Sequence, residues 1–208
     1  MPDKNKVKFG LKNAHYAIGT MANDGSVTYE TPVAVPGSVS LSISPEGELT
    51  PFYADNVVYW QGGGNSGYTG NWEVADLPDQ FKIDVLGYVK DENGVLVENA
   101  DAETKIFAFL FQMEGDVHAR RHVLYNCTAT RPEQTANTIA ENKEPITDSL
   151  PITAKSVYNA ALDINTPKAS VEQGDAAYAN WFEEVYQTTT AAAGSETGSE
   201  TGSETHNP

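Results

Sequence analysis

Two histidines and two arginines lie close together between Val117 and Ala129, and their types are the best suited to chemistry in this chain. Alternate residues of a strand share a face, so His118, Arg120 and His122 would lie together. The other face would carry Val117, Ala119, Arg121, Val123, Tyr125 and Cys127. Two imidazoles can bind one metal ion, but the spacing supplies no third ligand. We therefore expect a basic stripe that pairs with acids across strands or contacts an acidic patch on another copy.

Two loops resemble ligand-binding motifs only in part. Gln61–Gly67 is glycine-rich, but it lacks the Gly-Lys-Ser/Thr ending that holds phosphates and magnesium. Asp91-Glu92-Asn93-Gly94 could begin a calcium loop, but the twelfth position, which should be a bidentate Glu, is Ala102. We expect a plain loop at the first segment and a hairpin turn through Asn93-Gly94 at the second.

The sequence offers no other set of catalytic groups. It contains no nucleophile elbow, no dinucleotide fingerprint and no arrangement typical of a Ser/His/Asp triad. Scattered carboxylates could form a pair for glycoside hydrolysis, but any acidic β protein contains as many. We expect a protein that is not an enzyme, with no catalytic residue, no cofactor and no metal.

The composition bounds the partners and the compartment. The net charge is −16, from 29 acidic and 13 basic residues, so tight binding to DNA phosphates is disfavoured. The single cysteine, Cys127, excludes an intramolecular disulfide and is expected in a buried strand. The start has no apolar signal region, and no run approaches the ~20 apolar residues of a membrane span. We expect a protein made in the cytoplasm.

The elements that must position these residues are mostly strands. Apolar residues alternate with others at Val7–Leu11, Val39–Ile43, Tyr68–Val74 and, on one continuous face, Leu150–Ile164. The run Ile106–Phe111 is apolar at every position, which predicts a central strand buried on both faces. The turn Glu114-Gly115-Asp116 would join it to the following strand as a hairpin over about residues 104–129.

Two helices are predicted. The first covers about Pro78–Leu86, with Asp76 as its cap, Gly87 as its left-handed end, and Leu77, Phe81 and Val85 on one face. The second covers about Asp175–Tyr186, where Tyr178, Trp181, Phe182, Val185 and Tyr186 follow the spacing of an amphipathic helix. Its aromatic face must pack on its own sheet or on a neighbouring copy.

Three segments lack strong periodicity and are expected to be long loops: Thr20–Pro36, Gln61–Gly67 and Arg131–Pro145. The end repeats Gly-Ser-Glu-Thr from Gly194 to Thr205, a composition typical of flexible segments. We therefore predict one mainly β domain over residues 1–190 and a flexible acidic tail over residues 191–208.

Several stretches resemble the major tail protein, or tail-tube protein, family of long-tailed bacteriophages, in the form found in siphoviruses of Gram-positive hosts. The resemblance is most specific at Asp84–Glu98 (DVLGYVKDENGVLVE) and His122–Pro132 (HVLYNCTATRP). It also covers Lys6–Tyr16 (KVKFGLKNAHY), Pro36–Phe52 (PGSVSLSISPEGELTPF), Asp55–Tyr59 (DNVVY) and Tyr178–Tyr186 (YANWFEEVY), so it extends over about residues 4–187. The repeat at the end departs from the family pattern.

The resemblance implies a tail-tube-type β-sandwich with a flanking short helix, a C-terminal amphipathic helix and long loops or arms. It implies a structural virion protein that forms hexameric rings, which stack into the tube that delivers the genome. The implied partners are other copies, a tape-measure protein, assembly chaperones, the tail tip and the tail terminator, with DNA passing through the lumen without tight binding. His118, Arg120, His122, Tyr178, Trp181 and Phe182 are then expected at contacts between subunits.

Two other classes remain open from the residues alone. One is a monomeric β-sandwich binding module, such as a carbohydrate-binding domain or a host-surface adhesin, that exposes Trp60, Tyr68 and Trp72. The other is a glycosidase with a carboxylate pair. The assembly state distinguishes the first from a tube subunit, and a hydrolysis screen distinguishes the second.

Overall fold

The computed structural model describes residues 7–47, 50–54, 56–133, 136 and 145–188. These residues fold mainly as antiparallel strands, as the alternating sequence predicts. In chain order the strands are β1 (Leu11–Met21), β2 (Val27–Tyr29), β3 (Val33–Ala34), β4 (Ser38–Glu46), β5 (Thr50–Ala54), β6 (Val57–Gly62), β7 (Gly67–Val74), β8 (Val89–Lys90), β9 (Leu96–Val97), β10 (Phe107–Met113), β11 (Arg121–Ala129), β12 (Asp148–Lys155), β13 (Val157–Asn159), β14 (Ile164–Thr166) and β15 (Lys168–Val171). The helices are α1 (Asp79–Asp84) and a 3₁₀ turn, η1 (Ala176–Tyr178).

Nine strands form one sheet in the order β2-β1-β10-β11-β12-β7-β4, with β3 also paired to β1 and β15 to β11. The sheet is curled. Side chains from β1, near one end of the strand order, and from β7, near the other end, pack on the same helix. Tyr16 and Trp72 both contact Phe81 of α1, with ring centroids 4.9 and 5.7 Å away. The curled sheet and α1 therefore enclose one main core, as expected for a β-sandwich with a flanking helix.

The central strand β10 is buried on both faces, as its unbroken apolar sequence predicts. Phe107, Phe109 and Phe111 enter the main core, while Ala108 and Leu110 enter a second cluster on the opposite face. Burial of these side chains contributes roughly 1.5–3 kcal/mol for each large one. A one-residue bulge at Asn126, which has a φ of 46°, shifts the pairing of β11 with β10.

Because of this bulge, the two faces of β11 differ from those that strict alternation predicts. The strand begins at Arg121 rather than Val117, and Ala119 just before it has a φ of 46°. Val123 and Tyr125 pack in the second cluster, whereas Cys127 lies in the main core. Cys127 is buried, as expected, but it does not share a face with Tyr125 because the extra residue reverses the alternation.

The prediction of the first helix is confirmed, but the cap predicted for it is not. Leu77, Phe81 and Val85 are buried, and Gly87 ends the segment with a φ of 74°. The residue before the helix is Pro78, and no side chain caps it, so the expected role of Asp76 is wrong. The Asn93-Gly94 turn is confirmed, since β8 and β9 pair around it and the Gly94 amide donates to Asp91 O at 3.0 Å.

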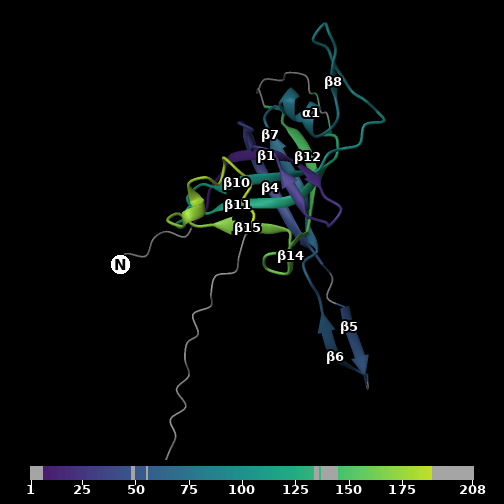
Figure 1. The fold of residues 1–208 in the computed structure, drawn as a ribbon, viewed down its shortest axis with the longest axis vertical. Helices are drawn as coiled ribbons and strands as arrows, with labels where there is room; N and C mark the ends of the chain where they lie inside the picture. The colour runs from purple at the N-terminus through teal and green to yellow at the C-terminus, as the bar shows by residue number, and fades with distance from the viewer. Residues whose placement is uncertain (1–6, 48–49, 55, 134–135, 137–144, 189–208) are drawn as a thin grey trace, which may run out of the picture.

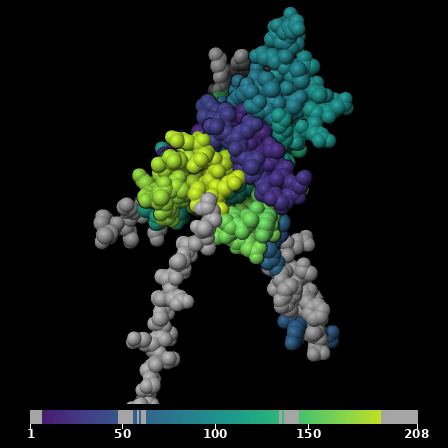
Figure 2. All heavy atoms as spheres, viewed as in Figure 1, coloured from purple at the N-terminus to yellow at the C-terminus, as the bar shows by residue number. Residues whose placement is uncertain are grey.

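The prediction of a second helix is wrong. Residues 175–186 form η1 and a series of turns instead of an α-helix. The segment lies on the second cluster, where Trp181, Val185 and Phe182 pack. The aromatic face therefore covers the chain's own sheet. Figure 2 shows this C-terminal segment (yellow) against residues of the N-terminal third (purple).

Three further expectations are corrected. Residues 7–10 do not form a strand, although Phe9 N donates to Glu114 O at 2.7 Å. The segment Thr20–Pro36 contains β2 and β3 rather than one loop. The long face Leu150–Ile164 is broken: β12 ends at Lys155, and β13 and β14 form a separate hairpin. Most of Arg131–Pro145 and the whole of 191–208 lie outside the described residues.

Two hairpins project from the sheet at opposite ends of the molecule (Figure 1). The β5–β6 hairpin directly follows β4 and includes the start of the expected loop Gln61–Gly67. The β8–β9 hairpin follows α1 at the other end. These two hairpins were not anticipated as projections, because the sequence shows pairing but not the direction in which a hairpin leaves a sheet.

Candidate functional site

The basic residues at the start of β11 form an ion-pair cluster at the surface rather than a stripe. Arg120 donates from Nε and Nη2 to Glu172 Oε1, at 2.8 and 2.6 Å, and His118 Nδ1 lies 3.2 Å from Glu172 Oε2. The hydrogen bonds from Arg120 lower the pKa of Glu172. The expected pairing with an acid is therefore present, and the acid belongs to the same chain.

His122 lies on the inner side of this cluster and is buried. Its ring packs on Phe111 with centroids 5.1 Å apart, and neither ring nitrogen has a hydrogen-bond partner among the described residues. Burial and the nearby Lys168 and Lys8 lower its pKa to about 4, so the ring is neutral near pH 7. No group of three or more His, Cys, Asp or Glu side chains able to hold a metal occurs in the described part of the chain.

The aromatic residues of the C-terminal segment surround Arg121. The Arg121 guanidinium lies 3.8 Å from the ring centroid of Tyr178 and 4.7 Å from that of Phe182, and Arg121 Nη1 donates to Tyr178 O. Phe182 also stacks on His15, with centroids 4.6 Å apart. Trp181 is buried and its Nε1 donates to His122 O at 3.4 Å. Of the six expected contact residues, His122 and Trp181 are therefore enclosed by their own chain.

The two ends of the strand order leave edges of the sheet. β4 is the last strand on one side, and its outer edge has no strand partner among the residues described. Its Ser40, Ser42 and Ser44 are exposed, and they alternate with the half-buried Leu41 and Ile43. β2 is the last strand on the other side. A strand edge without a partner is a surface on which another strand can pair, although Pro45 of β4 has no N–H to donate.

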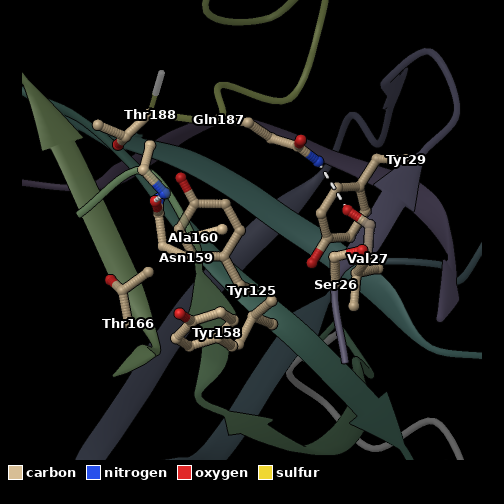
Figure 3. Close-up of a pocket in the computed structure, with 12 residues that line it drawn as sticks. Ser26, Val27, Tyr29, Tyr125, Tyr158, Asn159, Ala160, Thr166, Gln187 and Thr188 are labelled. Atoms are coloured by element: carbon tan, nitrogen blue, oxygen red, sulfur yellow. Dashed lines mark hydrogen bonds between the residues drawn. The ribbon is translucent and has the colours of Figure 1, made fainter. Parts of the chain in front are cut away.

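Beside β2 there is a pocket of about 270 Å³, which we call the tyrosine pocket. Figure 3 shows Ser26 and Tyr29 on one side, Asn159, Ala160 and Thr166 on the other, and Gln187 and Thr188 across the top. Its remaining lining residues are Val27, Tyr125, Val157, Tyr158 and Ala161. Burial raises the pKa values of Tyr29 and Tyr125, so both phenols stay protonated. No sequence pattern indicated this pocket, because its residues come from four separate segments.

Both projecting hairpins carry exposed apolar side chains. Val57 and Tyr59 of β6 are 60% and 75% exposed, and Val89, Val95 and Val97 around the β8–β9 turn are 49–56% exposed. By contrast, Trp72 is fully buried, so it cannot serve a binding face as the adhesin hypothesis requires. No helix among the described residues is long and apolar enough to cross a membrane.

Comparison with known proteins gives one family. A family model described as phage tail tube protein matches residues 3–197, which includes every described element. No curated protein matches the chain. The matched range contains both sheet edges, both projecting hairpins and the tyrosine pocket.

Proposed function

The chain belongs to the phage tail tube protein family and is a structural component of the tail, and we propose that its copies close into hexameric rings that stack into the tube. The observation that carries this proposal is the family match over residues 3–197, because it spans the whole described fold rather than one motif. The chain would then be assembled in the host cytoplasm and delivered as part of the virion.

The free edge of β4 supports ring closure. An isolated sheet edge is open to uncontrolled pairing, and a closed ring of sheets removes every edge. In a ring the β4 side of one copy would face the β2 side of the next, which is a head-to-tail contact. The exposed serines of β4 leave room for such pairing, since none of them is a charged residue that would block an approaching strand.

The expected subunit contacts are kept as proposals with different roles. His118 and Arg120 are accessible, and with Glu172 they would offer a mixed-charge surface to another copy. Tyr178 and Phe182 are partly buried against Arg121 and would contact a neighbour only through their outer edges. His122 and Trp181 are buried, so they would act by holding this surface in place.

The net charge of −16 supports passage of the genome through the tube. Carboxylates facing DNA phosphates repel them, so the nucleic acid would move without adhering. We further propose that assembly involves a tape-measure protein, chaperones, the tail tip and the tail terminator, and that no cofactor and no catalysis is needed.

Negative-stain electron microscopy of the concentrated chain, with light scattering on the same sample, tests the proposal. Hollow rings or tubes are expected, with a mass that is a multiple of the 22.5 kDa subunit. The variant Ser42→Lys, which places a charge on the β4 edge, should assemble less. Only monomers at every concentration, for both proteins, would contradict self-assembly of the free chain and favour the monomeric binding module.

A further inference from the structure

The tyrosine pocket is lined by aromatic and small polar residues, and the β5–β6 hairpin carries an exposed tyrosine. Tyr59 is, at 75%, the most exposed of the large apolar side chains whose positions the structure describes, and Val57 lies two residues before it on the same face of β6. The hairpin extends beyond the body of the molecule (Figure 1), so the sheet of its own chain does not cover these side chains. Val57 and Tyr59 therefore form a small apolar surface that another molecule could cover.

The pocket is already formed within the single chain. Gln187 Nε2 donates to Val27 O at 2.7 Å, and Tyr125 OH donates to Tyr186 O at 2.7 Å, so the C-terminal segment is tied to the pocket walls (Figure 3). Asn159 Oδ1 accepts from the amides of Ala161 and Leu162, which fixes the opposite wall. A preformed cavity loses little entropy when it is filled, which favours a rigid aromatic occupant.

The positions of the hairpin and the pocket indicate which molecule fills the pocket. The hairpin follows β4, one edge of the sheet, and the pocket lies beside β2, the other edge. In a head-to-tail pair the β4 side of one copy would face the β2 side of its neighbour, which would bring the hairpin of the first copy towards the pocket of the second. We propose that Tyr59 of each copy inserts into the tyrosine pocket of the adjacent copy.

The inserted ring would lie among the rings of Tyr29, Tyr125 and Tyr158. Aromatic pairs are favourable at centroid distances of about 4.5–7 Å, and Tyr29 and Tyr125 are already 6.2 Å apart. The Tyr59 hydroxyl would meet the polar side chains of Asn159 and Thr166 at the rim. One ring buries about 150–250 Å², far less than the ~800 Å² that each partner of a stable pair contributes. The contact therefore acts together with the β4 edge and fixes the register of that pairing.

Cysteine cross-linking tests the contact directly. This inference rests on the proposed self-assembly, so wild-type rings or tubes are confirmed first by electron microscopy. Chains carrying Tyr59→Cys are mixed with chains carrying Ala160→Cys and oxidised mildly, and disulfide-linked peptides are identified by mass spectrometry. The native Cys127 is buried and does not compete. A linked pair of residues 59 and 160 is expected in assembled samples and not in dilute monomer.

Two outcomes would overturn the inference while leaving the tube intact. Tyr59→Cys mixed with Val95→Cys is the matched control, because Val95 is 55% exposed on the β8–β9 hairpin at the other end. Linkage of residue 59 to residue 95, with none to residue 160, would place the β5–β6 hairpin against the β8–β9 hairpin of another copy instead. Linkage to 160 only in a chain truncated after Thr188 would show that the chain's own following residues fill the pocket.

Substitutions measure what the contact contributes. Tyr59→Ser should raise the concentration needed for half-maximal assembly by about tenfold or more, whereas Tyr59→Phe should retain most of the effect of the ring. Ala160→Trp fills the pocket and should weaken assembly to a similar extent, with no further loss when it is combined with Tyr59→Ser. All three variants should keep the melting temperature of the monomer. Full additivity of the two losses would contradict a shared contact.

Discussion

At the scale of single residues, Arg121 connects the sheet to the C-terminal segment. Its guanidinium contacts the rings of Tyr178 and Phe182 and donates to a main-chain oxygen of the same segment. A planar, delocalised cation can make these contacts together, whereas the point charge of lysine cannot. A substitution that keeps the positive charge therefore isolates the contribution of this geometry.

We predict that Arg121→Lys lowers the free energy of unfolding by about 1–2 kcal/mol, measured by urea denaturation at neutral pH. The matched control is Arg131→Lys, because Arg131 makes a surface ion pair with Glu98 at 2.5 Å, and such pairs contribute less than about 1 kcal/mol. Equal losses for the two variants would show that the stacked rings add nothing.

His122 makes stability depend on pH. Its pKa is lowered from 6.5 to about 4 in the folded chain, so below pH 6.5 the unfolded chain binds a proton that the folded chain does not. The contribution of neutral His122 to the free energy of unfolding is fully present above pH 6.5 and is lost as the pH falls towards 4. The loss is at most about 3.5 kcal/mol, since the pKa falls from 6.5 to about 4 and each pKa unit corresponds to about 1.4 kcal/mol.

We predict that His122→Phe flattens the fall in the free energy of unfolding between pH 6.5 and 4, compared with the wild type. Phenylalanine keeps the packing on Phe111 and removes both unpaired ring nitrogens. His118→Gln serves as control, because His118 is half-exposed and pairs with Glu172. A wild-type slope that persists in His122→Phe would assign the pH dependence to carboxylates instead.

At the scale of elements, the C-terminal segment replaces a helix that the spacing of its aromatic residues predicts. Isolated helices of about twelve residues are marginal, and aromatic and β-branched residues are weak helix formers. Docking on β10 and β11 therefore decides the conformation, and it selects a series of turns that bring Trp181 under the segment and Phe182 onto His15.

We predict that Trp181→Ala costs about 3–5 kcal/mol of folding free energy, because it empties a buried site and removes a hydrogen bond to His122 O. Glu184→Ala, at an exposed position of the same segment, should change stability by less than about 0.5 kcal/mol. Chemical denaturation of the monomer measures both. A small loss for Trp181→Ala would mean that the segment is only loosely held.

The β4 edge is the element whose exposure matters most for assembly. We predict that Ser42→Lys leaves the melting temperature of the monomer unchanged and raises the concentration for half-maximal assembly by about tenfold, since a charge on an edge opposes strand pairing. Asn93→Lys, in the β8–β9 turn, adds the same charge away from the edge and should assemble as the wild type does. Light scattering compares the two, and equal behaviour would exclude β4 from the interface.

At the scale of the whole molecule, the predicted domain boundary can be tested by truncation. A chain ending at residue 190 removes the Gly-Ser-Glu-Thr repeat and keeps every described element. We predict a melting temperature within about 1 °C of the full chain and unchanged ring formation. A clear loss of either would show that residues 191–208 belong to the domain or to its contacts.

The sequence by itself determined the fold class, the family and the main core. Alternation over Val39–Ile43 and Tyr68–Val74 predicted β4 and β7, and the unbroken apolar run predicted the doubly buried β10. The four-residue spacing of Leu77, Phe81 and Val85 predicted the buried face of α1. These features are local, because the period of a pattern follows directly from the geometry of a strand or a helix.

Only the tertiary structure decided which residues meet. The bulge at Asn126 moved Cys127 to the main core, and docking made turns of a predicted helix. The expected basic stripe became an exposed ion-pair cluster above a buried His122, because β11 begins only at Arg121. The tyrosine pocket had no signal in the sequence, since its walls come from segments more than a hundred residues apart. Periodicity gives the face on which a side chain lies, but it does not give the position of a bulge, the direction of a hairpin or the surface that a segment covers.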